Sequence, residues 1–205
     1  SKNKKSFIGL GTVPMQSSSH AIKELERCIH ELKFPGIQIG SCINGKNLDD
    51  PSLFDFYAAA EDLEASLLVH PWDMLGKDRM EKHWTPWLVG MPAETSLAIV
   101  SCMLGGIFEK YPKLKICFCH GGGALPYTLG RINHAYNVRP DLCATNSTIS
   151  PNDLIGRFWV DSIVHDEKTL KFLIDVIGSN NVVLGSDYPF PLGELRPGTL
   201  LKNRT

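Results

Sequence analysis

The chain has 205 residues, of which 43% are hydrophobic and 21% are charged, and its formal net charge is −1. This composition is typical of a globular domain large enough to bury a core, and it excludes a collagen, a coiled coil and a disordered chain. The near-neutral charge argues against a protein that neutralises nucleic-acid phosphates. We therefore expect no nucleic-acid partner.

The pattern of apolar residues bears on the cellular compartment. Apolar stretches such as 66–70 are too short to cross a bilayer, and the first five residues are not followed by a signal-peptide core. We expect no membrane partner, which makes the cytosol the default location. A chain of this size does not need disulfides. All six cysteines are therefore predicted to be reduced thiols: Cys28, Cys42, Cys102, Cys117, Cys119 and Cys143.

Short apolar runs alternate with segments of helical period along the chain. Strands are predicted over 7–13, 36–40, 66–70, 115–120, 158–164 and 182–187. Helices are predicted over 21–32, 51–63, 93–109, 124–137 and 167–177. Asp50 should cap the second of these helices, with Pro51 at its first position. The Trp- and Met-rich stretch 71–92 has little regular period, which predicts a long functional loop.

Strands of continuous apolar character that alternate with helices indicate βα units on a parallel sheet. Six strands fit an open doubly wound sheet, whereas a closed (β/α)8 barrel needs eight strands and typically about 250 residues. The pattern alone therefore favours the open doubly wound sheet. In either architecture the ligand site lies beyond the carboxyl ends of the strands.

Three polar residues stand at the ends of predicted strands, namely His70, His120 and Asp187. Two imidazoles and a carboxylate that converge there suit a borderline divalent metal such as zinc, and they equally suit a His-Asp acid/base set. A loop-capping role explains any one of them alone as well, but it explains all three together less readily. We therefore treat them as one candidate site.

Two thiols precede His120 in the run Cys117-Phe118-Cys119-His120. Because side chains alternate along a strand, the two cysteines should share one face, with Phe118 and His120 on the other. Both thiols therefore cannot join His120 in a metal site. We predict that they pack as small apolar side chains under the flanking helices.

Five strings carry a resemblance to a known family: 36–40 (GIQIG), 70–73 (HPWD), 87–95 (WLVGMPAET), 120–123 (HGGG) and 185–194 (GSDYPFPLGE). Together they resemble the decarboxylases of the metal-dependent amidohydrolase superfamily that act on an aminocarboxymuconate semialdehyde. The resemblance spans almost the whole chain. It implies a distorted (β/α)8 barrel in which the six predicted strands are numbers three to eight, and the open sheet becomes the alternative.

The resemblance also implies roles for particular residues. His70 and Asp187 match zinc ligands, and His120 matches the catalytic histidine that acts as general base on water whose pKa the zinc lowers. Trp87 and Phe190 match aromatic residues of the substrate pocket. The alternative for this aromatic pair is an ordinary place in the core.

Arg131 matches an arginine that reaches the neighbouring subunit's site and binds a substrate carboxylate, which implies a homodimer. Its alternative is an ordinary solvated charge on a helix. The implied reaction is the zinc-dependent decarboxylation of a small-molecule carboxylate, 2-amino-3-carboxymuconate 6-semialdehyde, in tryptophan catabolism through the kynurenine pathway. The alternatives are another hydrolase or decarboxylase of the superfamily, and a non-catalytic product that pairs with a longer subunit.

One departure from the family pattern concerns the metal. The family's first strand supplies two more ligands as His-x-His, and none of the seven histidines here stands two residues from another. The chain also stops at 200–205, where the resemblance implies a helix that covers strand eight. Residues 1–205 are therefore expected to form a single amidohydrolase-like domain that is truncated at both ends.

Overall fold

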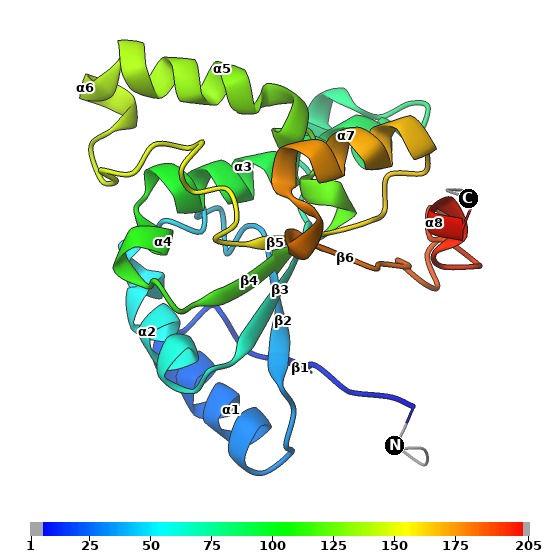
Figure 1. The fold of residues 1–205 in the computed structure, drawn as a ribbon. Coiled ribbons are helices and arrows are strands. Elements are labelled where there is room, and N and C mark those ends of the chain that lie inside the picture. The colour runs from blue at the N-terminus through cyan, green and yellow to red at the C-terminus, as the bar shows by residue number, and fades with distance from the viewer. Residues whose placement is uncertain (1–5, 203–205) are drawn as a thin grey trace.

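A computed structural model describes residues 6–202 of the chain. Six parallel strands form one sheet in the order β1-β2-β3-β4-β5-β6, so that each strand pairs with its neighbours in the sequence (Figure 1). The strands are β1 (Gly11–Thr12), β2 (Gly36–Gly40), β3 (Ser66–His70), β4 (Lys115–Phe118), β5 (Trp159–Asp161) and β6 (Val182–Val183).

Helices connect these strands. The α-helices are α1 (Ser18–His30), α2 (Phe54–Asp62), α3 (Met91–Leu104), α4 (Ile107–Lys110), α5 (Leu125–Val138), α6 (Pro140–Cys143), α7 (Glu167–Ile177) and α8 (Thr199–Lys202). Shorter turns of 3-10 type are η1 (Pro51–Leu53), η2 (Lys77–Arg79), η4 (His120–Gly122) and η5 (Ser179–Asn181), and η3 (Pro86–Gly90) is a π-helix. The predicted cap before α2 is confirmed, because the Asp50 side chain accepts a hydrogen bond from the Ser52 amide.

Most predicted elements are present, with corrections at their ends. Strands β2 and β3 and helix α7 have the predicted bounds, whereas β1 and β6 are only two residues long. Within the described sheet β1 pairs with β2 alone and β6 with β5 alone, so each has half the hydrogen-bonding support of an inner strand. The helix predicted over 93–109 is two helices, because Gly106 takes a φ of 76° between them.

The order of the strands decides between the two predicted architectures. A doubly wound sheet reverses its strand order at a switch point and carries helices on both faces. Here the order is sequential, as in a barrel wall, and α1 to α4 lie on one side of the strands (Figure 1). The predicted incomplete barrel is therefore confirmed, and the open doubly wound alternative is wrong.

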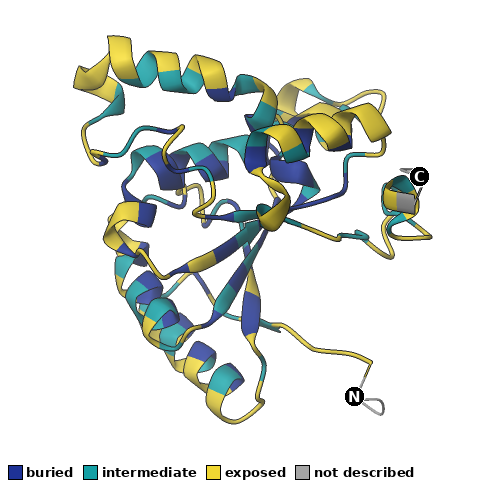
Figure 2. Cartoon of the chain, in the orientation of Figure 1, coloured by how far each residue is buried: buried dark blue, intermediate teal, exposed yellow. Residues whose placement is uncertain are grey.

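The core lies between the sheet and the helices, as the dark blue positions in Figure 2 show. Alternate residues of the inner strands are buried against the helices: Ile37, Ile39, Leu67, Val69, Ile116, Phe118 and Val160. The residues between them form one row across the sheet in register, Gln38, Leu68, Cys117 and Trp159, and none of the four is fully buried. We call the surface that carries this row the open face of the sheet.

The open face corrects one expectation about the cysteines. Ile116 and Phe118 belong to the helix-packed core, so the alternation along β4 directs Cys117 to the open face rather than under the helices. Partial burial there raises the pKa of the Cys117 thiol to about 12. All six cysteines are free thiols, as predicted.

One helical stretch, Pro86–Leu104, is long and apolar enough to cross a membrane when judged by length and composition. Half of its most apolar window is buried inside the protein. Ile99, Cys102 and Met103 on this stretch have no exposed surface and belong to the main core. Core packing therefore accounts for the apolar residues of its second part, whereas Leu88 and Val89 in its first turn are more than half exposed. The expectation that the apolar stretches are all too short to cross a bilayer is corrected for this stretch, because the sequence interpretation took 71–92 as a loop and did not join its end to the following helix.

Candidate metal centre

The structure brings together the three residues that end predicted strands. His70 ends β3, His120 follows β4 at the start of η4, and Asp187 lies in the segment after β6. The Nε2 atoms of His70 and His120 each lie 3.6 Å from Oδ1 of Asp187. One potential ligand atom from each residue falls within 4.8 Å of the others. The predicted convergence at the carboxyl edge of the sheet is confirmed.

Two members of this cluster have an unusual backbone. His120 has a φ of 57° and Asp187 a φ of 50°, in the left-handed region that residues other than glycine seldom adopt. Strained backbone of this kind persists where the surrounding structure enforces it, and it is concentrated at functional sites.

The face predicted for His120 is wrong. Strand β4 ends at Phe118, and His120 has a left-handed backbone, so the alternation of side chains along the strand does not extend to this histidine.

The donor set and its spacing fit a divalent metal. Two ligands about 2.1 Å from one zinc ion at a tetrahedral angle lie about 3.4 Å apart, close to the observed separations. A distance of 3.6 Å is too long for a hydrogen bond between imidazole and carboxylate. The Nε2 atom of His70 is buried and has no hydrogen-bond partner among the described residues. An ion between His70 and Asp187 would satisfy that atom.

The protonation of His70 also suits a metal ligand. Burial is the main cause that lowers the pKa of the His70 imidazole, and the neighbouring His120 lowers it further. Asp187 and a hydrogen bond to the Pro71 backbone oppose this shift without reversing it. The imidazole is therefore neutral at pH 7, the form whose nitrogen lone pair can bind a metal.

Two cavities adjoin the cluster. One of about 290 Å³ contains His120 and Asp187 together with Trp87, and a smaller one of about 50 Å³ contains His70, Asp187, Trp87 and Phe190. The Phe190 ring stacks on the His70 ring with 6.1 Å between centroids. Trp87 is 37% exposed and Phe190 is 55% exposed, so the alternative that they are core residues is wrong.

Arg131 is not brought to this site within one chain. It lies on α5, is exposed, and is outside the linings of the two cavities that contain the cluster. Figure 2 shows much of α5 and α6 exposed at the edge of the molecule. Within the described residues, the predicted role of Arg131 in substrate binding therefore has no support from the two cavities.

Sequence reasoning missed several residues near the cluster. Trp72 and Trp84 line the smaller cavity, and the Trp84 ring lies 5.7 Å from the Trp87 ring. Ser41, at the end of β2, donates a hydrogen bond of 2.9 Å to the buried carboxyl group of Glu94. The Trp-rich composition of 71–92 was the available signal for the tryptophans, whereas nothing in the sequence pairs Ser41 with Glu94.

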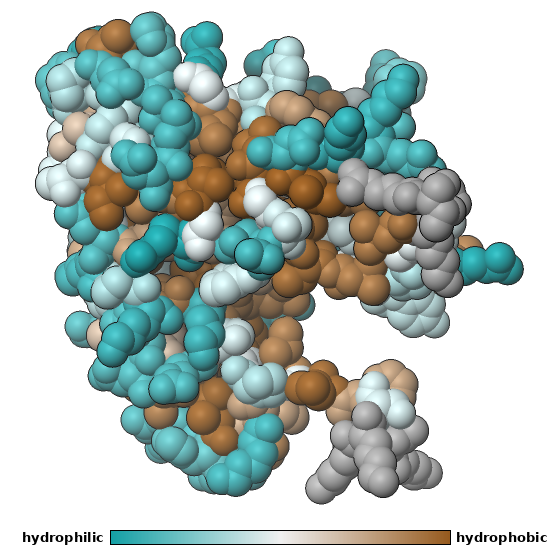
Figure 3. All heavy atoms as spheres, in the orientation of Figure 1, coloured by the Kyte–Doolittle hydropathy of each residue, from teal (hydrophilic) through white to brown (hydrophobic). Residues whose placement is uncertain are grey.

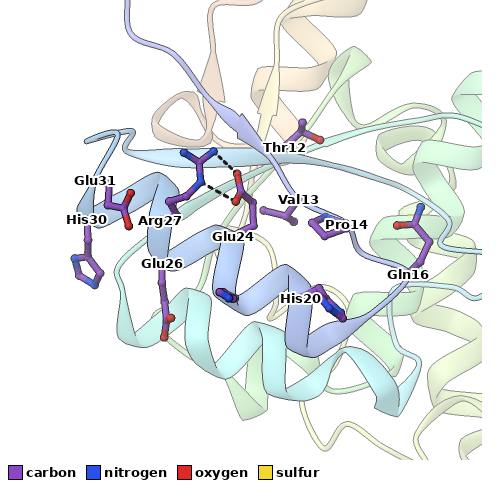
Figure 4. A pocket seen from close by; sticks show the side chains of 11 residues that line it. Thr12, Val13, Pro14, Gln16, His20, Glu24, Glu26, Arg27, His30 and Glu31 are labelled. Atoms are coloured by element: carbon purple, nitrogen blue, oxygen red, sulfur yellow. Dashed lines mark hydrogen bonds and ion pairs between the residues drawn. The ribbon is translucent and has the colours of Figure 1, made fainter.

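Other hollows lie away from the cluster. A cavity of about 360 Å³ borders His70 on the side of β1 and β2. A wider groove of about 970 Å³ runs along α1 beside the β1 edge (Figure 4). Its most prominent charged pair is mutually satisfied, because Arg27 donates hydrogen bonds of 2.8 and 2.7 Å to the Glu24 carboxylate. This groove has no cluster comparable to His70, His120 and Asp187.

The fold and the cluster together define a class of protein, a barrel-type protein with candidate metal ligands at the carboxyl ends of its strands. The sequence profile of the Amidohydrolase family matches residues 1–203. The chain belongs to this family.

Two curated relatives are decarboxylases by name. The 2-amino-3-carboxymuconate-6-semialdehyde decarboxylase of Dictyostelium discoideum is 60% identical over 203 residues, which cover 99% of this chain and 56% of the relative. The enzyme of the same name from Caenorhabditis elegans is 38% identical, with 96% of this chain and 61% of the relative covered. The chain thus spans little more than half the length of these relatives.

Solved structures agree in fold. The 5-carboxyvanillate decarboxylase of Sphingomonas paucimobilis superposes with a TM-score of 0.83 at 29% identity, covering 92% of this chain and 58% of that protein. A dihydroxybenzoic acid decarboxylase from Polaromonas, solved with bound manganese and an inhibitor, gives a TM-score of 0.79 at 27% identity, with coverages of 95% and 61%. Similar proteins of this fold therefore bind a divalent metal.

Proposed function

We propose that this chain is the metal-binding and catalytic part of a zinc-dependent decarboxylase that acts on 2-amino-3-carboxymuconate 6-semialdehyde in tryptophan catabolism. The observation that carries the proposal is the cluster of His70, His120 and Asp187 within 4.8 Å beside a cavity of about 290 Å³. The relative with 60% identity supports the choice of substrate. We further propose that the enzyme is cytosolic and works as a homodimer.

The proposal assigns a role to each residue of the site. His70 and Asp187 would hold the metal, which when bound supplies a Lewis acid that lowers the pKa of water at the site. His120 would act as the general base on that water, because its side chain lines the larger cavity, where a substrate would bind, beside the Asp187 carboxylate. Trp87 and Phe190 would enclose the conjugated carbon chain of the substrate.

The proposed reaction needs no organic cofactor, because water supplies both the nucleophile and the proton. His120 takes a proton from water, and the hydroxide adds to one carbon of the substrate's enamine double bond. The proton goes to the neighbouring carbon, which bears the leaving carboxylate. When the bond to that carboxylate breaks, carbon dioxide departs, its electron pair re-forms the double bond, and the hydroxide leaves. The net change is replacement of one carboxylate by a proton.

We also propose that residues 1–205 form one amidohydrolase-like domain to which two further βα units belong. The solved decarboxylases are covered only in part, and the cavity of about 360 Å³ beside His70 leaves room for more ligands on the side of β1. A His-x-His pair on the first of those strands would complete the metal site. We use the term extended enzyme for a protein that joins this chain to two such βα units.

Substrate turnover tests the proposal. The extended enzyme should release carbon dioxide from aminocarboxymuconate semialdehyde, and an otherwise identical protein with His120→Ala serves as the control. Residues 1–205 alone should be inactive and low in zinc, because two strands with unpaired edges invite aggregation and two expected ligands are lacking. Decarboxylation by residues 1–205 alone at the rate of the extended enzyme would contradict the proposal that the two strands are needed.

A second candidate is a related enzyme of different specificity. A Sphingobium 2-keto-4-carboxy-3-hexenedioate hydratase is 28% identical over 191 residues, and the solved neighbours are named as decarboxylases of aromatic acids. Parallel assays with 5-carboxyvanillate, a dihydroxybenzoate and the hydratase substrate separate these activities. If the enzyme turns over one of these three compounds and does not turn over the muconate compound, the proposed substrate is wrong and that compound takes its place. Metal binding without turnover of any of these compounds would favour the alternative that the chain is a non-catalytic protein.

A further inference from the structure

The end of β5 lies between the two strands whose ends carry His120 and Asp187. Among the described residues β5 contributes nothing to the metal-type cluster, yet Asp161 and Ser162 at its carboxyl end are polar and only 8% and 5% exposed. A buried carboxylate needs hydrogen-bond partners to offset the loss of water. The hydrogen-bond partners of the Asp161 carboxylate therefore indicate its role in the structure.

Asp161 holds the turn that carries His120. Its Oδ1 accepts a hydrogen bond of 2.9 Å from the Gly121 amide and one of 3.0 Å from the Ile163 amide. Four consecutive residues from His120 to Gly123 have positive φ values of 57°, 60°, 75° and 65°. The Gly121 amide, which follows His120 directly, is therefore fixed by a side chain from the neighbouring strand rather than by the strand ladder.

Ser162 holds the segment that carries Asp187. Its hydroxyl oxygen accepts a hydrogen bond of 3.2 Å from the Gly185 amide, two residues before Asp187. Gly185 also lies against Asp161, since a Cβ at this position would stand only 2.9 Å from the Asp161 Cβ. The segment after β6 is thus packed directly on the residue that fixes the His120 turn.

We infer that Asp161, assisted by Ser162, is a positioning residue that sets the separation of His120 and Asp187. This inference rests on the proposed metal centre. Both strained turns would otherwise relax toward ordinary backbone conformations, because a positive φ at His120 or Asp187 needs the surrounding structure to enforce it. Hydrogen-bonding partners that orient metal-site residues typically contribute 10- to 100-fold to metal affinity.

The test compares Asp161→Ala with Asp161→Asn in the extended enzyme, using zinc ions alone as the probe. Asp161→Ala should weaken zinc binding by roughly 10- to 100-fold, because the Gly121 amide loses its acceptor. Asp161→Asn keeps an acceptor oxygen and should stay within about threefold of the wild type, since the hydrogen bonds remain. Rescue by asparagine distinguishes positioning of the turn from a requirement for the negative charge.

Asp50→Ala is the matched control, because Asp50 also accepts a backbone hydrogen bond, 2.9 Å from the Ser52 amide, but lies outside the cluster. It should lower stability without changing zinc affinity. Equal zinc affinity in wild type and a folded Asp161→Ala protein would overturn the inference, as would an equal loss in Asp50→Ala. If Asp161→Ala does not fold, Ser162→Ala takes its place, with a weaker affinity expected and an unchanged affinity contradicting the inference.

A second readout separates this inference from the proposed function. In metal-free crystals of the extended enzyme, the distance from His120 Nε2 to Asp187 Oδ1 should remain near 3.6 Å in Asp161→Asn and change by more than about 1 Å in Asp161→Ala, the size of misplacement that impairs a site. An unchanged distance in the alanine variant overturns the inference even if the enzyme decarboxylates. A changed distance supports it even if the proposed substrate is not turned over.

Discussion

The two faces of the sheet differ in how completely this chain covers them. On the helix side, residues such as Phe118 and Ile37 have no exposed surface and belong to one continuous core. On the open face, Gln38 is exposed, and Leu68 and Trp159 are only partly covered. Figure 3 shows hydrophobic side chains around an indentation between the segments that precede β1 and follow β6. Phe7, Ile8 and Leu184 of these segments are all more than half exposed.

Stability and chemistry are therefore associated with different parts of the sheet. The helix face supplies the buried apolar area that stabilises the domain, and the helices that cover this face belong to the chain itself. The metal-type cluster stands at the carboxyl edge of the strands, beside the open face, where His70 borders the cavity of about 360 Å³. We therefore expect substitutions on the helix face to change the free energy of unfolding, and those at the carboxyl edge to change metal binding and turnover.

Substitution of the candidate general base at the carboxyl edge should change activity most. His120→Ala in the extended enzyme should lower turnover by roughly the 10²- to 10⁴-fold typical of a lost general base, while most zinc is retained. Steady-state kinetics and metal analysis of the same samples provide the measurement. Loss of zinc together with activity would instead make His120 a ligand, which the 3.6 Å separation from Asp187 also permits.

The helix face should respond next most strongly, in stability rather than in chemistry. Phe118 has no exposed surface and packs edge-on against Phe158 with 5.8 Å between ring centroids. Phe118→Ala should lower the free energy of unfolding by about 3–5 kcal/mol, the usual result of truncating a buried aromatic residue. Urea unfolding of the extended enzyme measures it.

The matched control for Phe118 is Leu68→Ala on the open face of the adjacent strand. If the open face carries little of the stability, this variant should lose less than the lower limit of about 2 kcal/mol seen for fully buried leucines. Equal losses for Phe118→Ala and Leu68→Ala would mean that the open face is covered as tightly as the helix face in the extended enzyme.

The weakest signal is expected from mixed dimers that test Arg131, which lies on helix α5 and is exposed. If Arg131 acts across a two-fold interface, mixing inactive Arg131→Ala with inactive His120→Ala subunits should restore about a quarter of wild-type activity, because half of the dimers would contain one intact site. Absence of any recovery in mixed dimers would place Arg131 outside the partner's site.

Much of the fold was predictable because it follows from local pattern. Strands β2 and β3 and helix α7 have apolar spacing that matches their burial, so their bounds agree with the prediction. The short edge strands β1 and β6 were predicted too long. Their apolar runs extend beyond the residues that pair with the neighbouring strand. Sequence pattern reports apolar spacing and does not report pairing.

The grouping of the three cluster residues was predictable from the topology of the sheet, whereas the hydrogen bonds that hold their turns were not predictable. Parallel strands bring their carboxyl ends together, so His70, His120 and Asp187 could be grouped from their places in the sequence. The contact between Asp161 and the Gly121 amide joins residues 40 positions apart through a turn of left-handed backbone. Neither the turn's conformation nor the partner of a buried carboxylate can be deduced from residue spacing.

Zinc content measures whether His70 and Asp187 hold a metal, which is the assignment on which the proposed function depends. The extended enzyme and its His70→Ala and Asp187→Ala variants are dialysed against the same zinc buffer and their metal is quantified per chain. We expect about one zinc per chain in the wild type, since three or four protein ligands complete one site, and a large loss in each variant. Full zinc occupancy in both variants would contradict the assignment.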